Sequence, residues 1–191
     1  MVQPERKKIA SITTVPASLA IGSRTSDVEA ELVYVGAGRQ ADYEGKDLIL
    51  EGVLKGAVMV MADFARHLGR ELTMDWMAVS SYGASTESSG VVRILKDLDA
   101  DLEGRHVIIV EDIIDSGLTL SWIMANLSSR KPASLEICTL LRKPEVAKVK
   151  IDVKYVGFDI PNEFVVGYGL DFAEDYRNLR CIGTLAPCVY S

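Results

Sequence analysis

The stretch that most constrains this chain is residues 107–120, VIIVEDIIDSGLTL. Its first four residues, 107–110, are apolar without alternation, a pattern typical of a strand buried on both faces of a parallel sheet. The strand leads into Glu111 and Asp112, so these acids stand at its C-terminal end. Small residues form a turn after them, and an apolar pattern at helical spacing resumes at Leu118. The sequence therefore predicts a strand, a turn and a helix N-terminus.

The turn at 115–119 has the features of an anion site. Free backbone N–H groups and the helix dipole favour a phosphate there, and ligands of open α/β sheets bind outside the carboxyl ends of the strands. Carboxylates beside a phosphate are compatible if they face a divalent cation or sugar hydroxyls, which predicts a sugar phosphate with Mg²⁺. A helix merely capped by Asp115 or Ser116 is the alternative, but it leaves Glu111 and Asp112 unexplained.

Composition excludes several other classes of protein. A chain of 191 residues predicts one domain, and a net charge of -6 argues against a nucleic-acid-binding surface. The three cysteines show no CxxC spacing, which favours reduced thiols in a cytoplasm over disulfides or zinc. No apolar stretch is long enough to span a bilayer. We therefore expect a cytoplasmic protein with no membrane or nucleic-acid partner.

Other segments repeat the strand-turn-helix pattern. The turn at 55–57 contains Lys55 and exposed amides, which suit an anion, although a solvated surface lysine is an equal alternative. The run 81–90 is rich in Ser, Gly and Thr, which predicts a mobile lid or an ordinary flexible connection. Further strands are expected at 47–54, 73–80 and 134–141, and helices at 59–68 and 118–128.

Cationic and aromatic residues follow the later strands. Lys143 stands at the carboxyl end of 134–141, and Arg177 is a candidate phosphate ligand. Phe164 lies in a segment rich in aromatics and glycine, where it could stack on a planar heterocycle or belong to the core. Residues 36–41 match G-x-G-x-x-A, but the chain there is too short for the crossover helix of a dinucleotide site.

Taken together, these segments resemble the type I phosphoribosyltransferases, specifically the hypoxanthine-guanine phosphoribosyltransferases. Residues 107–119 are similar to that family's signature for phosphoribosyl pyrophosphate, and its other blocks follow in the same order within residues 42–190. These other blocks are 54–56, 81–82, 141–144, and 156–171 with Arg177.

The resemblance implies a fold and a domain organisation. The fold is α/β, a mostly parallel twisted sheet flanked by helices, with a small hood lobe formed by the chain ends. Residues 1–191 would form a single phosphoribosyltransferase domain. Its core would span about 42–158, and its hood would come from about 1–41 and 159–191.

The implied reaction is Mg²⁺-dependent transfer of the 5-phosphoribosyl group to N9 of a 6-oxopurine, giving IMP or GMP and pyrophosphate in purine salvage. The implied ligands of the phosphoribosyl group and its 5′-phosphate are Glu111, Asp112, Asp115, Ser116, Gly117, Leu118 and Thr119. Those of pyrophosphate are Lys55, Gly56 and Arg177. Those of the purine are Lys143, Phe164, Val165 and Asp171, and the lid loop contains Ser81 and Tyr82. The implied metal ligands are Glu111, Asp112 and Asp171.

Individual roles also follow from the resemblance. Asp115 is implied as the general base that takes the proton from N7 of the purine. Lys143 would donate to the 6-oxo group, and a lysine cannot accept a hydrogen bond from the 6-amino group of adenine. Phe164 would stack on the base. The Leu54–Lys55 peptide can be cis in the family.

The sequence is also compatible with other functions. A non-catalytic nucleotide-binding regulator with the same fold is the main alternative, although the acidic charge and the presence of both Asp115 and Lys143 count against it. A nicotinamide dehydrogenase built on 36–41 is the weakest. Among 6-oxopurines, the sequence does not rank hypoxanthine, guanine and xanthine. The family suggests a homodimer or a homotetramer.

Overall fold

The computed structural model describes residues 45–81 and 92–190. Its centre is a six-stranded sheet with strand order β3-β2-β1-β4-β5-β6, in which β3 runs antiparallel to β2 and the other neighbours are parallel. The strands are β1 Leu48–Leu54, β2 Thr73–Ser81, β3 Val92–Lys96, β4 His106–Ile114, β5 Ser134–Arg142 and β6 Tyr155–Asp159. The predicted α/β fold with a mostly parallel sheet is therefore confirmed.

The central strand β4 is buried because it lies between two parallel neighbours and under two helical layers. Val107, Ile108, Ile109 and Val110 are at most 1% exposed. Successive side chains point to opposite faces, so Ile108 and Val110 join the core that contains Met61 of α1, whereas Val107 and Ile109 join the other core. The unalternating apolar run predicted this two-sided burial.

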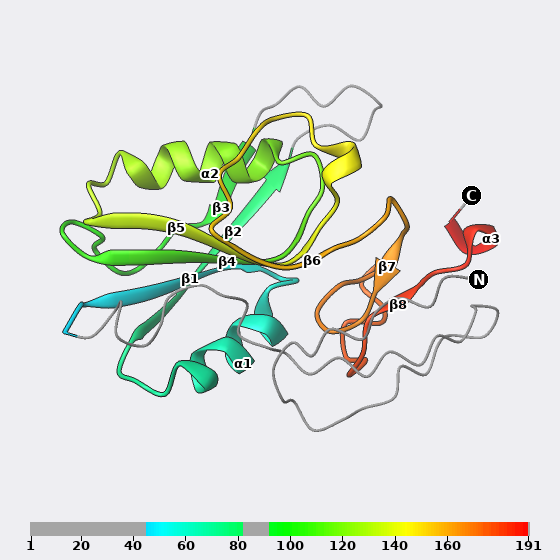
Figure 1. Ribbon diagram of the computed structural model, residues 1–191, viewed down its shortest axis with the longest axis horizontal. Helices are drawn as coiled ribbons and strands as arrows, with labels where there is room; N and C mark the ends of the chain where they lie inside the picture. Colours follow the sequence, from blue (N-terminus) through cyan, green and yellow to red (C-terminus); the bar gives the residue numbers. More distant parts are fainter. Residues whose placement is uncertain (1–44, 82–91, 191) are drawn as a thin grey trace.

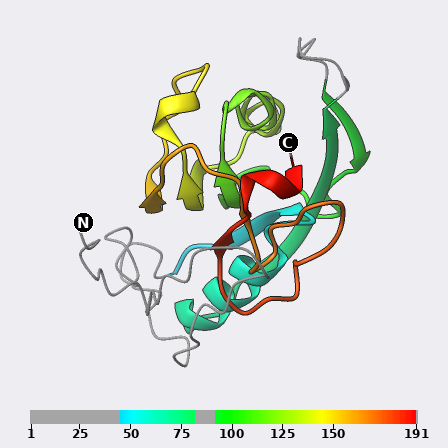
Figure 2. The same ribbon diagram turned by 90° about the vertical axis from the view of Figure 1, so that its right-hand side faces the viewer.

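The helices α1, Val58–Leu68, and α2, Leu118–Ser128, cover opposite faces of the sheet (Figures 1 and 2). Both begin directly after the carboxyl end of a strand, β1 for α1 and β4 for α2. Helix α1 ends at Gly69, whose φ of 58° provides a left-handed C-cap. No helix within 45–81 or 92–190 is long and apolar enough to cross a membrane.

The C-terminal residues form a separate small unit at one end of the sheet. Strands β7, Val165–Val166, and β8, Gly183–Thr184, pair antiparallel, and the short helix α3, Pro187–Tyr190, follows them. This unit lies beyond the carboxyl ends of the parallel strands (Figure 1). The expected N-terminal part of a hood, 1–41, and the dinucleotide pattern at 36–41 lie outside the described residues.

Cys138, Cys181 and Cys188 form no disulfide bond with one another. Cys138 packs against the core on the α1 side, and burial raises its pKa to about 12. A thiol with that pKa stays protonated at neutral pH and is a poor nucleophile.

One buried acid on β1 has no counterpart in the sequence analysis. Glu51 is 0% exposed, and neither carboxylate oxygen has a hydrogen-bond partner among the described residues. It faces the α2 side of the sheet and stands in register with Asp75 of β2. Burial, and then the charge of Asp75, raise the pKa of Glu51 from 4.5 to about 8. Ionising Glu51 is therefore costly for the folded state.

We expect Glu51→Leu to raise the free energy of unfolding at pH 8 by about 2 kcal/mol or more, because it removes a buried carboxyl without partners. The folded chain binds this proton more tightly than the unfolded chain, so the penalty is absent below pH 4.5, grows toward pH 8 and is complete above it. Urea denaturation at pH 5 and pH 8 measures the effect. Equal pH dependence in the variant and the natural protein would contradict this prediction.

Candidate functional site

The candidate site lies where the parallel strands β1, β4 and β5 end. Their last residues are Leu54, Ile114 and Arg142, and the backbone N–H of Lys143 donates to the carbonyl of Ile114 at 2.9 Å. The turns after these strands therefore meet at one edge of the sheet, as the position of polar residues in the sequence predicted. The C-terminal unit with β7 and β8 lies at this same edge (Figure 1).

The turn after β1 is packed directly against the acid of β4. The Leu54–Lys55 peptide is cis. A Cβ atom added to Gly56 would lie 1.6 Å from Oδ2 of Asp112, so no side chain fits there while Asp112 keeps its position. Burial raises the pKa of Asp112 to about 6, and the N–H of Ile113, which donates to Oδ1 at 2.8 Å, acts in the opposite direction. A partly buried carboxylate thus faces the Lys55–Gly56 turn.

This contact predicts the effect of Gly56→Ala. We expect a loss of about 1–3 kcal/mol in the free energy of unfolding, because the new methyl group displaces Asp112 or the turn. The double variant Gly56→Ala, Asp112→Ala should recover part of the loss, since it removes the atom that the methyl group meets. Thermal denaturation of both variants measures this. A Gly56→Ala protein as stable as the natural one would show that the turn adjusts freely.

The segment 167–177 packs against the Lys55–Gly56 turn. A Cβ added to Gly169 would lie 2.0 Å from the carbonyl oxygen of Gly56, and the φ of Gly169 is +103°. Arg177 donates from Nη1 to the carbonyl of Gly169 at 2.8 Å. The hydroxyl of Tyr168 donates to Asp63 of α1 at 2.5 Å. The C-terminal unit is thereby attached to α1 and to the Lys55–Gly56 turn.

Charged side chains of three segments meet at this contact. Lys55 pairs with Glu174 at 2.7 Å, and Arg177 pairs with Glu174 at 3.2 Å and with Asp171 at 2.8 Å. The charge of Arg177 also lowers the pKa of Asp112, and that of Asp171 raises it, after the larger effect of burial. The structure therefore brings together the residues expected to bind pyrophosphate, Lys55, Gly56 and Arg177, and two of the expected metal ligands.

A second group lies at the ends of β4 and β5. Lys143 is only 7% exposed, and its Nζ lies 3.0 Å from Oδ1 of the more exposed Asp115. Lys143 begins the connection after β5, and its backbone is bonded to the end of β4, which explains why the two side chains meet. A buried donor-only cation next to an accessible carboxylate can hold a planar ligand that both accepts and donates.

The turn between β4 and α2 keeps free donors at the edge of the site. Gly117 is the N-cap of α2, and as a glycine it offers no side chain to cap the helix. The carbonyl of Ser116 accepts from the N–H of Lys148 at 3.0 Å, which fixes the turn. The N–H of Leu118 donates to Oγ of Ser116 at 3.4 Å. The next N–H groups, of Thr119 and Leu120, have no partner within the helix, so they are suited to a phosphate.

The two neighbouring acids of β4 do not share one environment. Consecutive residues of a strand point to opposite faces of the sheet. Asp112 therefore lies on the α1 face, like Val110, whereas Glu111 lies on the α2 face, like Ile109. Glu111 is 8% exposed, and burial, then the charges of Asp112 and Glu51, raise its pKa well above the ordinary value. Asp112 is therefore the acid that directly faces the Lys55–Gly56 turn.

The donor set fits Mg²⁺ carried by a phosphate substrate. No group of three or more His, Cys, Asp or Glu residues in the described part of the chain forms a metal cage. Mg²⁺ in phosphate-binding sites commonly uses one or two carboxylates together with substrate phosphates and water. Asp112 and Asp171 offer hard oxygen donors beside the cations Lys55 and Arg177, which agrees with that pattern.

Phe164 lies just before β7 in the C-terminal unit. Its ring meets that of Phe172 edge to face, with 5.7 Å between the ring centroids and 89° between the planes. Val165 is the first residue of β7, and Ser81 is the last residue of β2. Tyr82 and the rest of the expected lid loop lie outside the described residues.

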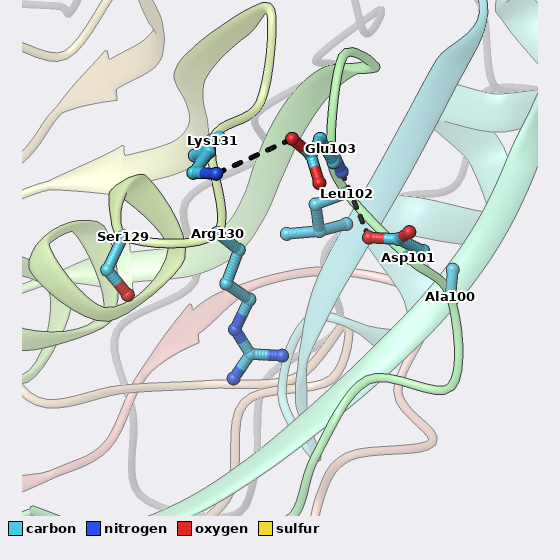
Figure 3. A pocket seen from close by; sticks show the side chains of 7 residues that line it. All are labelled: Ala100, Asp101, Leu102, Glu103, Ser129, Arg130 and Lys131. Carbon is cyan, nitrogen blue, oxygen red and sulfur yellow. Dashed lines mark hydrogen bonds and ion pairs between the residues drawn. The ribbon is translucent and has the colours of Figure 1, made fainter.

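A surface pocket of about 310 Å³ lies at the other end of the sheet (Figure 3). It is formed by residues 100–103, before β4, and 129–131, after α2. Lys131 and Glu103 form an ion pair at its rim, at 3.6 Å. The pocket therefore faces away from the polar residues that follow the strands.

Glu174 and Tyr168 were not among the site residues expected from the sequence. Glu174 pairs with a lysine 119 residues earlier in the chain, and Tyr168 bonds to an acid 105 residues earlier. No local pattern carries such information. Positive φ values at Tyr168, Ala173, Glu174 and Tyr176 mark the loop as unusual, but they are visible only in the structure.

Comparison with known proteins agrees with this geometry. Residues 37–173 match the phosphoribosyl transferase domain family. The hypoxanthine-guanine phosphoribosyltransferase of Mycobacterium avium is 63% identical over 146 residues, which cover 76% of this chain and 72% of that protein. The Bacillus subtilis enzyme of the same name is 51% identical over 164 residues, 86% and 91% of the two chains.

A solved structure shows the same fold. The crystal structure of a hypoxanthine phosphoribosyltransferase from Staphylococcus aureus is similar to this chain with a TM-score of 0.77 and 53% identity. The match covers 80% of this chain and 83% of that one. Similarity in sequence and in fold thus extends over most of the chain, the candidate site included.

Proposed function

Because this chain belongs to the hypoxanthine-guanine phosphoribosyltransferase family, we propose that its site transfers the 5-phosphoribosyl group from phosphoribosyl pyrophosphate to N9 of hypoxanthine or guanine. The products are IMP or GMP and pyrophosphate, so the enzyme acts in purine salvage. The observation that best supports this function is the pair Lys143 and Asp115, 3.0 Å apart, beside the N-terminus of α2, where the N-cap is Gly117.

The purine part of the site follows from hydrogen-bond chemistry. The Lys143 ammonium donates to the 6-oxo group, and because it cannot accept, it selects against the 6-amino group of adenine. Asp115 accepts the proton from N7 as the new bond forms at N9. In the free protein these two side chains pair with each other, so an arriving 6-oxopurine offers an acceptor to Lys143 and a donor to Asp115 in exchange. Phe164, with the Val165 backbone at its edge, stacks on the base.

The phosphoribosyl part uses the ends of β4 and α2. The turn 115–119 holds the 5′-phosphate through backbone N–H groups and the hydroxyls of Ser116 and Thr119. Glu111 and Asp112 orient the ribose hydroxyls and favour the positive charge that develops at the anomeric carbon in the transition state. Lys55, Gly56 and Arg177 hold the leaving pyrophosphate, on which negative charge accumulates.

Magnesium would be held by Asp112 with Glu111 on the ribose side and by Asp171 on the pyrophosphate side. Bound there, it would neutralise charge on the leaving group. The protein's own residues supply the rest, because Lys55 and Arg177 fix the phosphates and Asp115 moves the proton.

Organisation beyond the site is also part of the proposal. Residues 1–191 would act as one domain, in which the core 42–158 binds the sugar phosphate and the hood, 1–41 and 159–191, covers the base. A lid that contains Ser81 and Tyr82 would exclude water during transfer. We propose a cytoplasmic homodimer or homotetramer, which light scattering of the purified protein would distinguish.

The reaction itself can be tested by stoichiometry. Purified protein with phosphoribosyl pyrophosphate, Mg²⁺ and hypoxanthine should yield equal amounts of IMP and pyrophosphate, and chelation of the metal should stop both. Pyrophosphate release without IMP would indicate hydrolysis instead of transfer. Binding of phosphoribosyl pyrophosphate without any turnover would favour a nucleotide-binding regulator.

A further inference from the structure

Both cations assigned to pyrophosphate are already paired with one carboxylate. Glu174 lies 2.7 Å from Nζ of Lys55 and 3.2 Å from Nη2 of Arg177. These hydrogen bonds, that of Lys55 first, lower the pKa of Glu174. Among the ion pairs between described residues, Asp171 pairs with Arg177 alone. Glu174 is thus the described carboxylate that pairs with both cations.

The backbone directs Glu174 toward these cations. Phe172 and Asp175 exchange two backbone hydrogen bonds, of 3.2 and 3.0 Å, which close a tight turn with Glu174 near its tip. The N–H of Glu174 donates to Asp171 at 2.9 Å. Ala173 and Glu174 have φ values of 52° and 70°, which side-chain-bearing residues rarely adopt. A turn held in such a conformation presents the Glu174 side chain in a defined direction.

We propose that Glu174 is an internal counter-anion of the pyrophosphate site, occupying Lys55 and Arg177 in the free protein and exchanging with the phosphate groups of the substrate. This inference rests on the proposed function of those two residues. Carboxylates and phosphates compete for the same donors, and the fork of an arginine suits either. Glu174 therefore opposes the binding of pyrophosphate and promotes its release.

The strength of these pairs suits exchange. The side chains of Lys55 and Glu174 are 64% and 63% exposed, and ion pairs between exposed side chains are weak, because water screens the charges and both side chains lose freedom when they pair. Pyrophosphate, which carries several charges, can displace such a carboxylate. When pyrophosphate departs, the nearby carboxylate replaces it, so the cations are not left unpaired.

The test is binding of inorganic pyrophosphate with Mg²⁺ to the purified protein, measured by isothermal titration calorimetry. Glu174→Gln keeps the shape of the side chain and removes its charge, and we expect its Kd for pyrophosphate to fall about threefold to tenfold. Glu103→Gln is the matched control, because Glu103 is 66% exposed and pairs with Lys131 at the far edge of the sheet. Its Kd should equal that of the natural protein.

Lys55→Ala separates this inference from the proposed function. It should weaken pyrophosphate binding, and Glu174→Gln should give a smaller gain in that background, because one of its two cations is gone. If Lys55→Ala weakens binding but Glu174→Gln leaves it unchanged or weaker, the counter-anion role is overturned alone. If Lys55→Ala binds pyrophosphate as the natural protein does, the proposed pyrophosphate site is overturned as well.

Discussion

Replacing Asp115 with asparagine should lower turnover about 100-fold or more without disturbing the fold, the usual scale for loss of a general base. The side chain of Asp115 is 57% exposed, so an uncharged amide of the same size costs little stability there. The asparagine oxygen can still accept a hydrogen bond from Lys143, but it cannot take the N7 proton. Steady-state kcat with saturating hypoxanthine and phosphoribosyl pyrophosphate measures the effect.

Asp97→Asn is the matched control for this experiment. Asp97 is 50% exposed and pairs with Arg130 at 2.7 Å, far from the ends of β4 and β5. Its kcat should stay within about twofold of the natural value, as for most surface substitutions. A kcat for Asp115→Asn as high as that of the control would remove Asp115 as the base.

Lys143→Ala should raise the KM for hypoxanthine about 10-fold to 100-fold, because a hydrogen bond to a charged group is worth about 1.5–3 kcal/mol. The KM for phosphoribosyl pyrophosphate should change much less, since the 5′-phosphate and pyrophosphate are assigned to other residues. Initial-rate kinetics with each substrate varied in turn measure both constants. The ratio of the two changes in KM decides whether Lys143 binds the purine or has a structural role.

Arg142→Ala provides the comparison, because Arg142 precedes Lys143 but forms two bonds to Asp159, of 2.7 and 3.0 Å. It should affect stability more than the KM for the purine. If Lys143→Ala raised the two substrate KM values equally, Lys143 would be a residue that maintains the turn after β5 and not the purine selector.

The central strand and its helix could be predicted from composition and spacing. An apolar run without alternation can be buried only between two layers, and β4 from His106 to Ile114 has that position. The carboxyl ends of parallel strands share an edge, so the meeting of the turns after β1, β4 and β5 also followed from the sequence. The start of α2 at Leu118 needed only local signals.

Short strands and long-range contacts could not be predicted in this way. Strands β7 and β8 have two residues each, too few for any periodicity, and β3 borders a polar loop that gave no strand signal. The pairing of Glu174 with Lys55 depends on the path of the whole C-terminal segment. Glutamate is rarely fully buried, so the burial of Glu51 could not be expected from its residue type and is seen only in the structure.

The measurement that most directly tests this account is an assay of the purified protein with phosphoribosyl pyrophosphate and Mg²⁺, offering hypoxanthine, guanine, xanthine and adenine separately. We expect nucleotide from hypoxanthine and guanine and none from adenine, because Lys143 can donate to a 6-oxo group but cannot accept from a 6-amino group. The rate with xanthine would rank the third 6-oxopurine. Turnover of adenine at the rate of hypoxanthine would contradict the assignment of Lys143 and of the substrate class.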